Sequence, residues 1–166
     1  MGTQAMILKE GTLVDWTRFE NSVYDRFGVN TVILDRQGQR RTKTDMQWAN
    51  GLCALIKTDL TGASRICNRL LIRLMGQCRA NKASAIDECA AGMNKYVLPI
   101  IENDRIDGFV NICGRPLLNT DRIYTDYIGK TICLKTETIR KLLATIKPID
   151  PRTVKEMKRY ITAYRN

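Results

Sequence analysis

Residues 96–113 contain the pattern that most restricts the fold. Two apolar runs, 96–101 and 106–113, are separated by the polar residues "ENDR". Runs of this length around a polar turn are typical of two β-strands joined in an antiparallel hairpin. A sheet built on such a hairpin has to be covered, and the rest of the chain reads mainly as helices.

The remaining elements follow from apolar spacing. The segment 61–80 is a strong amphipathic helix, with Cys67, Leu71, Leu74 and Cys78 on one face. Further helices are predicted at 13–27, 48–56, 136–147 and 150–164, and a second hairpin at 29–44 whose second strand, 39–44, is weak because it is polar. The expected fold class is therefore α+β, a small antiparallel sheet flanked by helices, with two helices at the C-terminus.

Composition limits the class of protein. With 166 residues, 44% hydrophobic and 27% charged, the chain has the composition of one soluble folded domain. No apolar run approaches the roughly 20 residues that span a membrane. Residues 1–11 lack the apolar core of a secretory signal and are interpreted as a lead-in or a remnant of cloning. These observations predict a cytoplasmic protein without membrane contact.

The net charge of +10 permits a nucleic-acid partner, although a solvated basic surface is the alternative. The last two helices are joined by "KPIDP", whose two prolines and missing glycine argue against a helix-turn-helix reader. Direct nucleic-acid binding is therefore not expected, and a basic binding or structural module is the rival interpretation. No paired carboxylates, phosphate loop or nucleophile–base pair suggests an enzyme. The absence of histidine excludes histidine-dependent triads and histidine-ligated zinc or haem.

Four segments, "FGVNTVILDRQGQ", "GLCALIKTDLTGASRIC", "ECAAGMNKYVLPII" and "DRIDGFVNICG", resemble the PocR-type sensory domain over roughly residues 12–118. The resemblance implies a PAS-like fold, a place in bacterial signalling proteins and transcription regulators, and sensing of small molecules such as simple hydrocarbon derivatives. Many members carry histidine directly after the third cysteine, where this chain has Ala90. A five-stranded PAS-like sheet needs one strand more than the four predicted here. We expect a sensory domain at 12–134 and a helical pair at 135–166 packed on it.

Cys53, Cys67, Cys89 and Cys113 lie in the segments that carry the resemblance, whereas Cys78 and Cys133 do not. Cys67 and Cys78 are eleven residues apart on one helix, about 16 Å at 1.5 Å per residue, so they cannot share a site. We expect the four to converge, with Gly92 allowing the chain to reverse after Cys89. Four thiolates without histidine suit zinc or an iron–sulfur cluster. The alternative is that all four are small buried hydrophobic residues.

Three further expectations concern ligands and assembly. Trp48, Asn50, Met93 and Asn94 flank the family-like motifs and are predicted to surround a largely apolar pocket for a small molecule. Arg65, Arg69 and Arg73 repeat at every fourth position, which suits an anion site or a solvated helix face. The apolar stripes of the two C-terminal helices are predicted to pack on each other and on the domain, or across a homodimer, and to transmit the signal.

Overall fold

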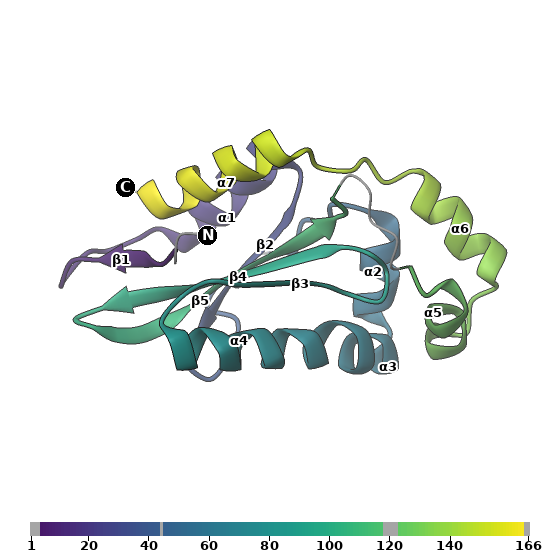
Figure 1. The fold of residues 1–166 in the computed structure, drawn as a ribbon, viewed down its shortest axis with the longest axis horizontal. Coiled ribbons are helices and arrows are strands. Elements are labelled where there is room, and N and C mark those ends of the chain that lie inside the picture. The colour runs from purple at the N-terminus through teal and green to yellow at the C-terminus, as the bar shows by residue number, and fades with distance from the viewer. Residues whose placement is uncertain (1–3, 44, 118–122, 165–166) are drawn as a thin grey trace.

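The computed structural model describes residues 4–43, 45–117 and 123–164. The strands are β1 (Met6–Leu8), β2 (Asn30–Asp35), β3 (Ala85–Glu88), β4 (Asn94–Glu102) and β5 (Arg105–Arg115). The helices are α1 (Trp16–Phe27), α2 (Gly51–Thr58), α3 (Leu60–Gly62), the π-helix η1 (Ala63–Asn68), α4 (Arg69–Asn81), α5 (Thr125–Ile132), α6 (Thr136–Ala144) and α7 (Pro151–Ala163). Together they form an α+β fold with one sheet and two C-terminal helices, as the sequence predicts (Figure 1).

The predicted hairpin is the centre of the sheet. β4 and β5 pair antiparallel from Glu102 opposite Arg105 to Asn94 opposite Arg115. Within the described residues the strand order is β1-β4-β5-β2, and β3 also pairs with β4. β3 and β1 lie end to end along the same edge of β4, because β3 pairs with its first residues and β1 with its last. β1 runs parallel to β4, so the sheet is mixed rather than purely antiparallel.

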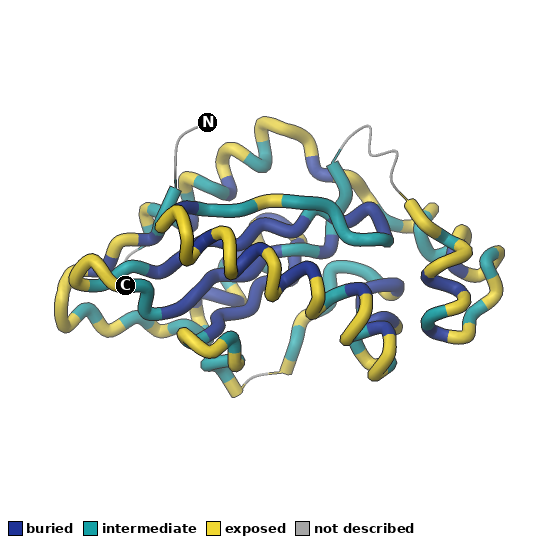
Figure 2. Tube along the Cα trace, turned by 60° about the horizontal axis from the view of Figure 1, so that its bottom comes forward, coloured by how far each residue is buried: buried dark blue, intermediate teal, exposed yellow. Residues whose placement is uncertain are grey.

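Helices cover both faces of the sheet, as Figure 1 shows with α1 and α7 above and α4 below. Alternating strand residues supply the two cores, since neighbouring side chains point to opposite faces. Ile33, Leu98 and Val110 pack under α1 and α7. Val32, Val97 and Phe109 pack against α4, whose inward face appears as buried segments alternating with exposed ones in Figure 2.

A third apolar cluster, which we call the end cluster, lies beyond one end of the sheet. It joins α2, η1, the turn after β3, α5 and α6 (Figure 1). Its buried members are Leu52, Cys53, Ile56, Ile66, Ala91, Met93, Ile128, Ile132 and Ile139. The segments that carry Cys53, Cys67 and Cys89 therefore all contribute side chains to the end cluster, whereas β5, which carries Cys113, does not.

The predicted second strand at 39–44 is wrong for residues 39–43, and Thr44 lies outside the described residues. Gln39 and Arg41 each make one backbone hydrogen bond to β2, at 2.8 and 2.9 Å. The buried carboxylate of Glu20 then takes the Ile33 N–H at 2.9 Å and binds the Thr42 hydroxyl, so the backbone ladder stops. Side-chain acceptors replace the backbone partners of this segment, and a strand is not formed.

The sequence also missed three elements. Met6–Leu8, within the segment interpreted as a lead-in, forms β1, and Met6 is fully buried. β3 and α5 were not predicted either. With β1 and β3 present and 39–43 absent as a strand, the sheet has five strands in the described residues, the number that a PAS-like sheet requires.

The two C-terminal helices, predicted to pack on each other and on the domain, instead pack at different ends of the fold. Ile139 of α6 is buried in the end cluster, whereas Met157 and Ile161 of α7 are buried against α1 and the sheet. Residues 145–150, which we call the strap, connect the two helices along the molecule (Figure 1). Arg115 fixes the strap, because its guanidinium donates to the carbonyls of Lys147 and Pro148 at 3.0 and 2.6 Å and to that of Phe27 at 2.8 Å.

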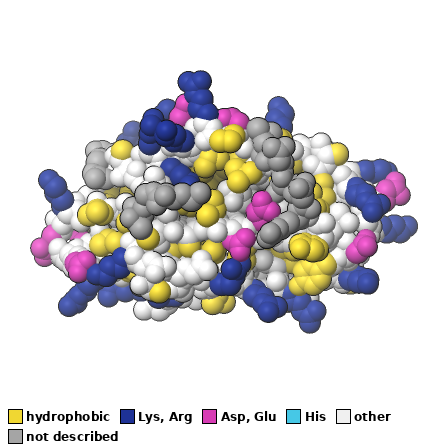
Figure 3. All heavy atoms as spheres, viewed as in Figure 1, with side chains coloured by type: hydrophobic (Ala, Val, Ile, Leu, Met, Phe, Trp, Pro, Cys, Tyr) yellow, Lys and Arg dark blue, Asp and Glu magenta, His cyan; other side chains and the backbone are white. Residues whose placement is uncertain are grey.

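The basic side chains are dispersed over the surface rather than gathered in one patch. On the face in Figure 3, Lys and Arg side chains lie at many separate places around the outline, with Asp and Glu among them. This face offers no continuous basic strip of the kind that follows a nucleic-acid backbone. Each helix of the described residues is too short or too polar to cross a lipid bilayer.

Candidate functional site

The start of α2 is fastened to the end of β5 by Asn50. The side-chain oxygen of Asn50 accepts the Cys53 N–H at 2.7 Å, which caps the helix. Its amide nitrogen donates to the Gly114 carbonyl at 2.6 Å and lies 3.2 Å from the Cys53 sulfur. Gly114 has φ +105, and a Cβ there would stand 2.7 Å from Ala49. These contacts bring Cys53 next to the part of β5 that carries Cys113.

Cys89 opens the turn between β3 and β4. Its carbonyl accepts the Gly92 N–H at 2.8 Å, and its own N–H donates to the Met93 carbonyl at 3.0 Å. Gly92 has φ +73, a conformation that glycine adopts without the steric cost of a side chain. The predicted reversal of the chain at Gly92 is confirmed. It returns the backbone along β4 and leaves Cys89 facing the end cluster.

The thiols of Cys53, Cys67, Cys89 and Cys113, which we call the four-cysteine site, act on one another. Burial is the main cause that raises the pKa of Cys53, and repulsion from Cys113, Cys89 and Cys67 raises it further. Burial likewise raises the pKa of Cys67, with a smaller contribution from Cys113. Cys53 is buried in the end cluster, and Cys67 and Cys89 pack against it. The convergence of all four thiols, Cys113 included, stays a prediction.

The other two cysteines lie elsewhere. Cys78 is fully buried under the sheet, where its thiol donates to the Val97 carbonyl at 3.4 Å. Cys133 is exposed at the end of α5. Among the described residues, no three Cys, Asp or Glu side chains already stand at metal-binding spacing. Metal binding by the four cysteines therefore stays a prediction.

A lysine that the sequence analysis did not single out lies beside these thiols. Lys95 is only 2% exposed, and its ammonium donates to the Cys67 carbonyl at 3.3 Å. Burial raises the pKa of Cys89 to about 11, and the charge of Lys95 is one of the causes that oppose the rise. The same charge opposes the effect of burial on Cys67. No acidic side chain in the described part of the chain forms an ion pair with Lys95.

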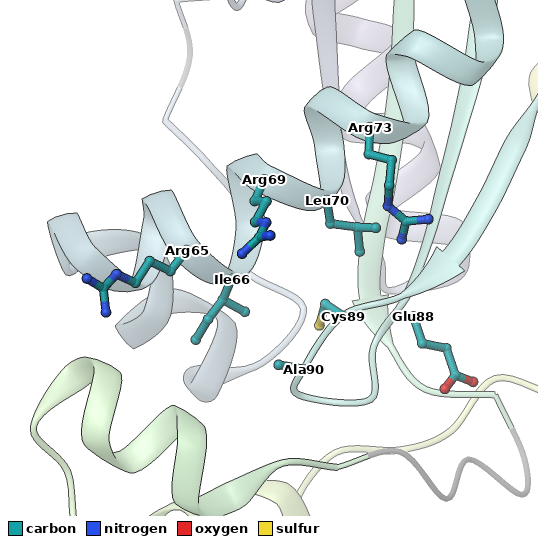
Figure 4. A pocket seen from close by; sticks show the side chains of 8 residues that line it. All are labelled: Arg65, Ile66, Arg69, Leu70, Arg73, Glu88, Cys89 and Ala90. Carbon is teal, nitrogen blue, oxygen red and sulfur yellow. The ribbon is translucent and has the colours of Figure 1, made fainter.

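The predicted ligand-binding residues gather here only in part. Trp48 packs against the end cluster, which contains the buried Met93, and the Asn50 amide lies 4.0 Å from the Met93 sulfur. Asn94 begins β4, opposite Glu88 and Arg115. A cavity of about 350 Å³ does open at this end of the sheet, but its lining comes from η1, α4 and the turn after β3 (Figure 4). The four predicted residues do not line it.

Comparison with known proteins gives the family. The family described as the sensory domain found in PocR matches residues 13–166, which includes α6 and α7. Searches of curated proteins and of solved structures found no match. Since the match covers nearly the whole chain, the protein belongs to the family of PocR sensory domains.

Proposed function

We propose that this sensory domain reads its signal at the four-cysteine site, which binds zinc or an iron–sulfur cluster through thiolates. The observation that carries the proposal is Lys95, a buried ammonium that donates to the Cys67 carbonyl and whose charge opposes the rise in pKa of Cys67 and Cys89. A buried charge without a counter-charge costs several kcal/mol. Zinc or an iron–sulfur cluster held by four thiolates carries a net negative charge, which would balance the ammonium.

The raised pKa values agree with such a site. Burial, with added repulsion from neighbouring cysteines, raises the pKa of Cys53 and Cys89 and keeps these two thiols protonated near neutral pH. A bound metal deprotonates its cysteine ligands outright, so binding would release protons and replace neutral thiols by coordinated thiolates. If the group were lost or broken down by an oxidant, the ligands would return to separate thiols, and the packing around them would change with it. A group of this kind would supply sensitivity to metal supply or to oxidants.

The route from the site to the rest of the protein runs through α6. Leu142 and Leu143 of α6 pack against the end cluster together with the buried Ile139. The strap then leads to α7, and Arg115 ties the strap to β5 and to the end of α1. We infer that a change of packing at the cysteines shifts α6 relative to α7, and that this shift reaches the regulatory output of a cytoplasmic bacterial signalling protein.

The test is the metal content of protein purified without air. We expect bound zinc, or iron with sulfide and a brown colour, in the parent protein. Single changes of Cys53, Cys67, Cys89 or Cys113 to serine should reduce the bound metal to a small fraction of the parent value.

Cys78→Ser and Cys133→Ser are the matched controls, because they remove a buried and an exposed thiol outside the site. Both should keep the metal. A parent protein that contains no metal after anaerobic purification and reconstitution would contradict the proposal. So would an equal loss in the control variants.

A further inference from the structure

The cavity shown in Figure 4 has a lining that the four-cysteine site does not account for. It lies between the helix formed by η1 and α4 and the turn that follows β3. Arg65, Arg69 and Arg73 come from the helix, and Cys89 and Ala90 from the turn. We call this cavity the arginine cleft. At about 350 Å³ it is at the small end of the range for ligand pockets.

The arginines of the cleft differ in what they contact. Arg73 forms an ion pair with Asp87 of β3. For Arg65 and Arg69, no acidic side chain of the described residues is within ion-pair distance. Figure 4 shows the Arg69 guanidinium directed toward the gap between Ile66 and the turn, whereas Arg65 extends along the helix. Among the described residues, Arg69 is therefore a positive charge without an acidic partner at a concave surface.

The floor of the cleft is apolar. Ile66 and Leu70 lie on the same helix as the arginines and are 4% and 7% exposed. The π-helix η1 lies between α3 and α4, and π-helical turns within α-helices occur frequently at functional sites. Glu88 lines the far end, and its carboxylate points away from the helix in Figure 4. A negative charge there disfavours an anion at the Arg73 end and leaves the Arg69 end for one.

We propose that the arginine cleft binds a small carboxylate with a short apolar chain. The planar guanidinium of Arg69 matches a carboxylate with two parallel hydrogen bonds, and rotation of Arg65 adds a second cation. Ile66, Leu70 and Ala90 then contact the apolar chain. Through Cys89 the ligand lies next to the four-cysteine site, yet its recognition requires no metal.

Butyrate is a suitable probe, with 1-butanol as the uncharged analogue and inorganic phosphate as an anion without an apolar chain. Binding is followed by amide chemical shifts at near-physiological salt, which suppresses unspecific attraction to the basic protein. We expect saturable shifts at residues 65–70 and 89–90 with butyrate alone. Arg69→Gln should weaken this binding at least about tenfold, because a charge-assisted bidentate contact is lost.

Arg105→Gln is the matched control, since it removes the same charge from an exposed residue at the opposite end of the sheet. It should bind butyrate like the parent, and Arg69→Lys should bind with intermediate strength. Equal binding of butanol, binding of phosphate only, equal loss in Arg105→Gln, or no saturable shift would each overturn the inference. Arg69→Gln should keep the parent amide spectrum and metal content, so this result and that of the cysteine variants are independent.

Discussion

Lys95 is an unusual residue for the middle of a sheet. It stands in β4 between Asn94 and Tyr96 and is nearly as buried as the apolar residues that follow it. Its cross-strand neighbour Asp87 forms an ion pair with Arg73 of α4. The Lys95 ammonium instead donates to the backbone carbonyl of Cys67. The positive charge of a lysine in this position stabilises the thiolate forms of Cys67 and Cys89.

Replacing Lys95 by methionine should separate the metal site from the fold. We expect metal affinity to fall about 10- to 100-fold, the usual range for a lost partner of a metal ligand. The metal-free protein should melt at the same or a higher temperature, because an apolar chain of similar length replaces a poorly paired charge. Metal titration and thermal unfolding measure the two effects.

Lys130→Met, at an exposed position of α5, serves as the control and should leave metal affinity unchanged. If Lys95→Met keeps full metal affinity, Lys95 is not the counter-charge of the site.

At this scale the sequence indicated part of the site. The spacing of Cys67 and Cys78 on one helix was enough to exclude Cys78, and the small residues before Gly92 indicated the reversal after Cys89. Lys95 gave no such signal, because a single lysine at the start of a strand usually faces water. The face to which it points depends on the irregular pairing of β4 with β5 between Asn94 and Tyr96. That pairing joins residues distant in sequence, and no local pattern encodes it.

Helices α6 and α7 illustrate what periodicity does and does not determine. The apolar stripes correctly indicate that Ile139, Met157 and Ile161 turn inward. The stripes do not indicate on which surface each helix packs, since any apolar surface can bury an apolar stripe. The structure places the two stripes on different clusters, one beside the thiols and one against α1. The strand predicted at 39–44 fails for the same reason, a contact between residues distant in sequence. The carboxylate of Glu20, which accepts the Ile33 N–H in place of a backbone carbonyl, belongs to α1.

The separation of α6 and α7 predicts different effects of two similar substitutions. Ile139→Ala and Met157→Ala should each lower the free energy of unfolding by about 2–5 kcal/mol, because both side chains are buried. Ile139→Ala should also loosen the end cluster and accelerate metal loss to a chelator. Met157→Ala, on the other side of the molecule, should leave the rate of metal loss per folded protein unchanged.

Urea unfolding and chelator kinetics distinguish the two helices. Equal acceleration of metal loss by both variants would show that the metal responds to overall stability and not to α6.

For the whole molecule, the layer between α4 and the sheet gives a pH dependence that does not involve the four-cysteine site. Burial raises the pKa of Cys78 from its usual 9.0 to about 11. Between pH 9 and 11 the unfolded chain loses this proton while the native protein keeps it. The stabilisation is therefore complete below pH 9 and is lost as the pH rises through 11.

We expect the free energy of unfolding of the metal-free protein to fall by up to about 1.4 kcal/mol per pH unit in this range from Cys78 alone. Urea titrations at several pH values measure the slope. Cys78→Ala should flatten it, whereas Cys133→Ala, which removes an exposed thiol, should not. An unchanged slope in Cys78→Ala would mean that this thiol does not titrate with unfolding.

β1 has a practical consequence for work on this family. Met6–Leu8 pairs with Ile100–Glu102 of β4, and the Gln4 side chain accepts a hydrogen bond from the Tyr96 hydroxyl at 2.8 Å. A protein trimmed to the family match at residue 13 would lose these contacts and uncover an apolar strand edge. Unpaired edges of this kind recruit strands from other molecules, so such a fragment would tend to aggregate for a reason unrelated to sensing.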